Sequence, residues 1–188
     1  MINTMNKNIN STVSQYTSNF PQEAEYCQPL LSLSESKQDI ASRKTTPDHV
    51  TCSGIVFHQK QNIWHVLMIH HTFLDKWLFP GGHIEKEDAT LEAAAIREIT
   101  EETGLPSSNL QPLFENQPID INTHPIPENI KKNEPQHNHW DLRYAFTTTQ
   151  ESLTLEEGAI TDARWMKISD VPETQQKIMK RAMALLQG

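Results

Sequence analysis

Cysteine, positive charge and long apolar runs are all scarce in this chain of 188 residues. The two cysteines, Cys27 and Cys52, belong to no Cys-x-x-Cys or zinc-ligand spacing, so we expect reduced structural thiols rather than a disulfide or a nucleophile. The net charge of −8 argues against an extended nucleic-acid surface, because such a surface needs a basic patch. No run approaches membrane-spanning length and the start lacks an apolar secretory segment, so we expect a cytoplasmic protein that does not enter a membrane.

The apolar segments that could form a core begin only near His49. Residues 1–46 are rich in Asn, Ser, Thr and Gln, and we interpret them as a flexible polar N-terminal extension. Within them, Leu30, Leu31 and Leu33 could form one short docking element. Residues 47–188 are expected to form a single folded domain, since that length suffices for a core.

The stretch from Gly81 to Leu105 reads as a turn followed by a helix. Pro80 and the two glycines after it are typical of a turn. A helix is predicted from about Thr90 to Thr103, with Asp88 or Thr90 as its N-cap. Gly104 is expected to end it.

Three carboxylates share one face of this predicted helix. Glu98, Glu101 and Glu102 fall at i, i+3 and i+4, where like charges repel. Arg97 can hold one of them, but a hard divalent cation such as Mg²⁺ would satisfy all three. The alternative is a solvated acidic face, which is the usual fate of a charge run.

These residues resemble the Nudix hydrolases, whose box is written Gly-x5-Glu-x7-Arg-Glu-U-x-Glu-Glu-x-Gly-U, with U an apolar residue. The second half matches at every fixed position: Arg97, Glu98, Ile99, Glu101, Glu102, Gly104 and Leu105. The first half is one residue longer than the consensus, which puts Ala89 where the first glutamate belongs. Asp88 or Glu87 could replace it.

The resemblance implies an α/β class fold, the Nudix α/β/α sandwich with a central mixed sheet, over residues 47–188. It also implies a Mg²⁺-dependent (or Mn²⁺-dependent) pyrophosphohydrolase, which cleaves a nucleoside diphosphate linked to another group X. The expected partner is therefore a small-molecule diphosphate; no feature of the sequence indicates an oligomeric state.

The resemblance also assigns roles to residues. Glu98, Glu101 and Glu102 would be metal ligands, and one of them could act as the base. Arg97 would orient a carboxylate, and Gly82 would permit close approach of the loop. Glu157, just before Gly158, is the candidate for a further carboxylate from a late loop; a solvated loop acid is the alternative.

Two other functions compete with hydrolysis. An isoprenoid diphosphate isomerase shares the superfamily fold but needs an active-site cysteine, and Cys52 has no matching context. A non-catalytic nucleotide-binding or regulatory module is the other alternative, which the irregular first half of the box favours and the intact second half opposes.

A second group of polar residues lies outside the box. His137, His139, Asp141 and Arg143 alternate along a predicted strand and should share one face. With His124 they are similar to a signature of one group of bacterial Nudix proteins. We expect the three histidines to border the substrate pocket, where they would bind a second, transition metal or the leaving group. The alternative is a polar strand face with ordinary hydrogen bonds.

The remaining pattern predicts alternating strands and one more helix. An amphipathic helix is expected to start near Asp170. The expected strands are 50–57, 64–69, 110–114, 118–121, 137–147 and 160–168.

Overall fold

The computed structural model describes residues 3–130, 134–155, 158 and 160–187. Its centre is one mixed sheet in which β3, β2, β1, β7 and β5 are successive neighbours; β4 also pairs with β1, β6 with β7 and β8 with β2. Among the described strands, only β1 and β7 pair in parallel. The strands are β1 (Asp48–Lys60), β2 (Ile63–His71), β3 (Lys76–Leu78), β4 (Gly81–His83), β5 (Gln111–Pro112), β6 (Asp120–Ile126), β7 (His137–Thr148) and β8 (Ile160–Lys167).

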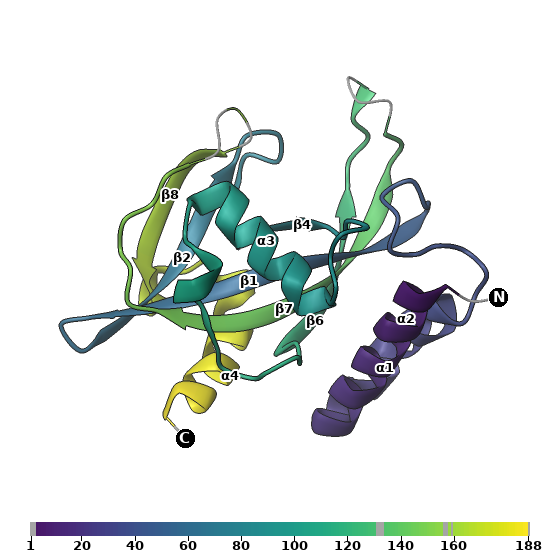
Figure 1. Cartoon of the computed structure of the whole chain (residues 1–188), viewed down its shortest axis with the longest axis horizontal. Coiled ribbons are helices and arrows are strands. Elements are labelled where there is room, and N and C mark those ends of the chain that lie inside the picture. The colour runs from purple at the N-terminus through teal and green to yellow at the C-terminus, as the bar shows by residue number, and fades with distance from the viewer. Residues whose placement is uncertain (1–2, 131–133, 156–157, 159, 188) are drawn as a thin grey trace.

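A helix covers each face of this sheet (Figure 1). The box helix α3 (Leu91–Thr103) packs against one face through Ala94, Ala95 and Ile99, which are fully buried. The last helix α4 (Gln176–Gln187) packs against the other face through Ile178 and Met179. The expected α/β/α arrangement is therefore confirmed. Among the described residues, no helix combines the length and the apolar character needed to cross a membrane.

The last helix begins later than expected. Pro172 has an extended backbone (ψ 141°), so a continuous helix cannot start near Asp170. Single 3-10 turns occupy the intervening chain instead, at Ile168–Asp170 and Glu173–Gln175.

The expectation of a flexible N-terminal extension is wrong for the described residues. Two helices, α1 (Thr4–Asn19) and α2 (Ala24–Ser34), joined by a 3-10 turn at Pro21–Glu23, form a hairpin beside the sheet (Figure 1). The physical reason is an apolar stripe at helical spacing, which is wholly buried in the same core cluster as α3. Its members are Ile9, Val13, Tyr16, Cys27 and Leu30, each with 0% exposed surface.

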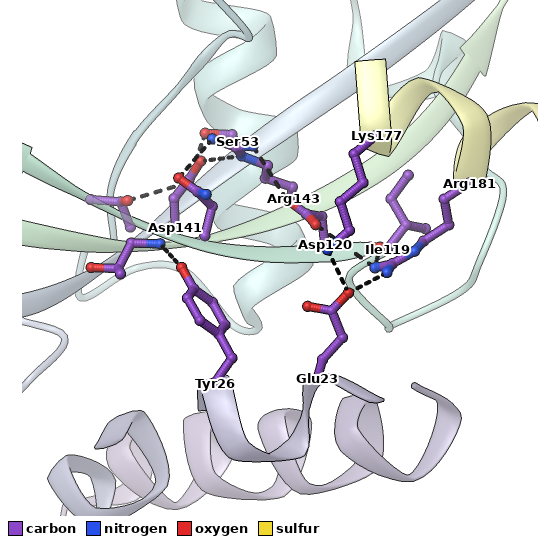
Figure 2. Close-up of polar contacts among 12 residues, drawn as sticks. Glu23, Tyr26, Ser53, Ile119, Asp120, Asp141, Arg143, Lys177 and Arg181 are labelled. Carbon is purple, nitrogen blue, oxygen red and sulfur yellow. Dashed lines mark hydrogen bonds and ion pairs between the residues drawn. The ribbon is translucent and has the colours of Figure 1, made fainter. Parts of the chain in front are cut away.

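Polar contacts also tie the hairpin to the rest of the molecule (Figure 2). The Arg181 guanidinium on α4 donates to the Glu23 carboxylate and to the Tyr16 hydroxyl. The Thr123 amide on β6 donates to the Tyr26 hydroxyl at 2.7 Å. The hairpin is therefore held against both the last helix and a strand of the sheet.

Candidate active site

The helix that carries the glutamates has the ends that its sequence predicts. The Thr90 hydroxyl accepts a hydrogen bond from the Ala93 amide at 3.0 Å, which identifies Thr90 as the N-cap. Gly104 ends the helix in the left-handed conformation, with φ 70°. The run between these caps is unbroken, so the spacing of the three glutamates along the helix is kept.

Arg97 is the centre of an ion-pair network between the helix and the loop before it. Its Nη1 donates to Glu98 Oε1 at 2.9 Å and to Glu101 Oε2 at 3.0 Å. Its Nε and Nη2 bind both oxygens of Asp88, and Nη2 also donates to the His83 carbonyl. Burial disfavours the charged guanidinium, but its hydrogen bonds to Asp88 and the charge of Glu98 outweigh burial and raise the Arg97 pKa. One cation thus fixes two helix carboxylates relative to the loop.

Asp88 is the loop acid that contacts the helix. Its side chain is almost fully buried, and it also accepts the Glu85 amide at 2.8 Å. Glu87, the other residue considered for this position, is exposed. Because both oxygens of Asp88 face Arg97, its carboxylate braces the loop rather than opening into the cavity described below.

The two glycines of β4 let the sheet approach the glutamates closely. The Gly81 amide donates to Glu102 Oε2 at 2.9 Å, and Glu102 is buried. A Cβ on Gly82 would lie 2.5 Å from Glu98 Oε1. Position 82 therefore excludes any side chain while the Glu98 carboxylate occupies its present place.

Arg97 pairs with two carboxylates of the helix, and Glu98 is the more buried of them. Its side chain is 14% exposed, against 53% for Glu101. Burial raises the pKa of Glu98 above its ordinary value; Arg97 opposes the shift, and the charges of Glu101 and Asp88 add to it. A divalent cation would offset this crowding of negative charge.

A polar strip crosses the sheet on β1 and β7. In the parallel pairing of β1 with β7, His49 is the partner of His139 and Thr51 is the partner of Asp141. The buried Asp141 carboxylate accepts hydrogen bonds from Ser53 Oγ at 2.7 Å and Thr51 Oγ1 at 3.2 Å. Asp141 also pairs with Arg143 Nε at 2.9 Å (Figure 2).

Histidines gather at one end of this strip. His137 Nε2 lies 3.1 Å from His139 Nε2, and His49 Nε2 lies 3.2 Å from His83 Nε2. The His139 ring also lies near His124, with ring centroids 5.7 Å apart. Burial, then the neighbouring histidines, lower the pKa of His139 to about 2, so its imidazole is neutral near pH 7.

One cavity of about 360 Å³ joins the two groups. Its volume lies within the range of small-molecule sites. Both Glu98 and residues of the polar strip line it. Gly82 lines it, together with polar residues that include Ser53, His83, Glu85, Glu98, His124, His139, Asp141 and Arg143.

A family comparison identifies this arrangement. The model of the NUDIX domain matches residues 47–186. The chain belongs to the Nudix family. It is a hydrolase of phosphoric anhydride bonds, as its pyrophosphohydrolase relatives are.

Similar proteins come from several organisms. A Lactococcus lactis protein named probable DHNTP pyrophosphohydrolase is 32% identical over 129 residues, which cover 68% of this chain and 72% of the relative. The structure of a Nudix-family hydrolase from Clostridium perfringens shares 26% identity and covers 73% of this chain and 95% of its own, with a TM-score of 0.51. The structure of the C. elegans Ap4A hydrolase shares the fold, with a TM-score of 0.53. Its match has 13% identity and covers 73% of this chain and 97% of the hydrolase.

The Nudix-box residues and the histidines predicted from sequence are brought together only in part. Gly82, Glu98, His124, His139 and Asp141 line the cavity. Three of the predicted residues do not line it: Arg97, Glu101 and Glu102. Arg97 donates to Glu98, which lines the cavity, and also to Glu101. Glu102 accepts from the Gly81 amide, and Gly81 lines the cavity. His137 is buried behind His139. Glu157 lies outside the described residues.

Sequence reasoning missed three residues of the Nudix cavity and its histidine cluster. His49 and His83 belong to the cluster, and Ser53 supports Asp141. The alternation of polar residues at 49, 51 and 53 along β1 is a signal that could have found two of them.

Neither cysteine serves this site. Cys52 is fully buried on the core side of β1, and burial raises its pKa well above the ordinary value. Cys27 is buried in the N-terminal hairpin. A cysteine-dependent isomerase mechanism therefore finds no accessible thiol in the described residues.

Proposed function

We propose that this Nudix hydrolase is a Mg²⁺-dependent pyrophosphohydrolase of a nucleotide or a related small diphosphate. The observation that supports the proposal is a cavity lined both by Glu98 and by the polar strip of the sheet. This arrangement can accommodate a cation and phosphates next to Glu98 while the remainder of the substrate contacts Asp141 and the histidines.

The residues present fit a hard cation. Glu98, Glu101 and Glu102 offer only carboxylate oxygens, and Mg²⁺ takes a few such ligands together with water and substrate phosphates. When bound, the ion would neutralise phosphate charge and lower the pKa of water. We assign Glu98, Glu101 and Glu102 as its ligands; Mn²⁺ could replace it.

The side chains around this site have separate tasks in the proposed reaction. Arg97 holds Glu98 and Glu101 in position, and the Gly81 amide does the same for Glu102. Water attacks a phosphorus atom, the P–O–P bridge breaks, and the proton of the water passes to a carboxylate. We propose Glu98 as the acceptor, because it is the one of the three assigned ligands that lines the cavity.

The name of the Lactococcus lactis relative suggests a specific substrate to test. Dihydroneopterin triphosphate carries a nucleotide-like ring and a triphosphate, which is the chemical class that we propose. Its pterin could lie against the polar strip of the sheet, with the phosphates near Glu98.

The test is turnover of purified, tag-free protein with Mg²⁺ and with Mn²⁺. The panel should contain dihydroneopterin triphosphate, nucleoside triphosphates, ADP-ribose, a dinucleoside polyphosphate and isopentenyl diphosphate. We expect metal-dependent release of phosphate or pyrophosphate from at least one diphosphate. Isomerised isopentenyl diphosphate, or tight binding with no turnover of any compound, would overturn the proposal in favour of the isomerase or the binding module.

A further inference from the structure

Three histidines from two neighbouring strands point ring nitrogens at one place. His49 on β1 and His137 and His139 on β7 each offer a nitrogen, and these three atoms lie within 4.8 Å of one another. His49 and His139 are partners in the parallel pairing of the strands, so the backbone of the sheet fixes their separation. None of the three belongs to the Nudix box.

Two of the rings are oriented by backbone carbonyls. His49 Nδ1 lies 2.8 Å from the Thr45 carbonyl, and His137 Nδ1 lies 2.7 Å from the Pro135 carbonyl. A carbonyl oxygen only accepts, so in the neutral form of each ring Nδ1 carries the proton and Nε2 keeps a lone pair. Metal-binding histidines are usually held this way, with the second ring nitrogen donating to a carbonyl or carboxylate.

The donor set determines the class of cation. Bonds of 2.0–2.1 Å in a tetrahedral site hold neighbouring nitrogen ligands about 3.4 Å apart. His137 Nε2 and His139 Nε2 are 3.1 Å apart, close to this spacing. All three nitrogens lie within 4.8 Å of one another, so His49 would have to move closer by at most about 1.4 Å. Imidazole nitrogen suits Zn²⁺, Co²⁺, Ni²⁺ or Cu²⁺, whereas Mg²⁺ prefers oxygen.

We propose that His49, His137 and His139 bind one divalent transition-metal ion, with Zn²⁺ as the representative case. Of the three histidines, His139 lines the cavity, so the proposed site adjoins it. This site is distinct from the carboxylate site on α3 in its residues, its ligand atoms and its cation. The proposal goes beyond the proposed hydrolase activity and does not depend on it.

A chain of hydrogen bonds is the competing explanation for the short distances. In that arrangement, His139 Nε2–H donates to His137 Nε2, and His83 Nε2–H donates to His49 Nε2. This explanation predicts that the histidine cluster has no affinity for transition metals. Metal titration therefore separates the two explanations.

The experiment uses the full chain, freed of any tag and stripped of metal by a chelator. Zn²⁺ binding is measured by equilibrium dialysis, and Co²⁺ binding by its visible absorption, in the presence of excess Mg²⁺ to occupy the carboxylates. We expect one tight ion per chain in wild type. His137→Asn and His139→Asn should each weaken binding at least roughly tenfold, since losing even an outer-shell partner has effects of that size.

Two controls assign the ion to its place. His65→Asn removes a histidine of β2 that bonds the Ile63 carbonyl outside the cluster, and it should bind like wild type. Glu98→Gln removes a carboxylate of α3 and should also leave Zn²⁺ stoichiometry at one. Circular dichroism and thermal melting report whether each variant is folded.

The proposal fails in two ways that the experiment can show. Wild type that binds no Zn²⁺ or Co²⁺ would support the hydrogen-bonded chain. Equal affinity in wild type, in folded His139→Asn and in His65→Asn would place the ion elsewhere. His139 is only partly buried, so its variant provides the decisive comparison should the buried His137 variant not fold.

Discussion

The Glu23 carboxylate, between the two N-terminal helices, accepts a hydrogen bond of 2.5 Å from Arg181 on the last helix (Figure 2). Lys177 contacts the same oxygen at 3.1 Å. The two ends of the chain are thereby joined across 158 residues. The hairpin is part of the folded unit, and its removal should not be harmless.

We predict that the apolar stripe of α1 contributes to stability. Ile9→Ala should lower the free energy of unfolding by about 2–5 kcal/mol, because Ile9 is fully buried. Ser14→Ala, on the exposed side of α1, should change it by less than about 0.5 kcal/mol. Urea denaturation at pH 7 measures both. Equal stability of the two variants and wild type would restore the view of residues 1–46 as a dispensable extension.

The Glu23 contact should depend on pH. Burial alone would raise its pKa, but hydrogen bonds from Arg181 and Lys177 outweigh burial and lower it below 4.5. A carboxyl group whose pKa is depressed by folding stabilises the fold above its unfolded pKa, and loses that contribution as the pH falls through the folded pKa. Glu23→Gln should therefore cost about 1–3 kcal/mol at pH 7 and progressively less below pH 4.5. Urea denaturation across that range measures the difference, and a cost independent of pH would contradict the prediction.

Substitution of the helix carboxylates should abolish most turnover without unfolding the protein. Glu101→Gln or Glu102→Gln keeps the shape but removes one negative charge, so we expect at least about a hundredfold loss in kcat. Glu92→Gln is the matched control on the same helix, because Glu92 bonds the Asn116 amide outside the cavity. Steady-state kinetics on the best panel substrate measures this. Full activity in folded Glu101→Gln and Glu102→Gln would remove the assigned metal site.

Two glycines should respond differently to the same methyl group. In Gly82→Ala the new Cβ meets the carboxylate end of the Glu98 side chain rather than backbone, so the carboxylate should move and kcat should fall at least about tenfold at nearly unchanged stability. In Gly54→Ala the Cβ meets Ile99 Cδ1 in the core at 2.2 Å, so stability should fall instead, by roughly 1–3 kcal/mol. Thermal melting and steady-state kinetics on both variants measure these effects. A large loss of stability in Gly82→Ala, with a loss of kcat alone in Gly54→Ala, would refute the prediction.

The box helix was predictable because its signals are local. Thr90, Gly104 and the unbroken run between them determine where the helix begins and ends. Its neighbour Asp88 could not be chosen over Glu87 from spacing alone. The choice depends on which acid reaches Arg97, and that is set by the fold of the loop.

The N-terminal hairpin was missed although its pattern is present. Ile9, Val13, Tyr16 and Phe20 follow helical spacing, but Asn, Ser and Thr between them are poor helix formers. Burial against the core, a tertiary effect, stabilises these helices and is invisible in composition.

The histidine cluster was half predictable. Alternation along one strand brings His137 and His139 together, as expected. Adding His49 requires knowing that β1 lies beside β7 and in which register, and a shift of one residue would turn His49 to the opposite face.

The parallel pairing of β1 with β7 also has a consequence for the order of events during synthesis. Asp48 pairs with Asn138, so 90 further residues must be synthesised after this end of β1 before the paired residue of β7 exists. At about 5–20 residues per second, this wait lasts roughly 5–20 s on the ribosome. The residues of the box helix have been synthesised well before then, whereas His139 and Asp141, which also line the cavity, have not. A nascent chain therefore carries its box glutamates well before the residues that complete the cavity.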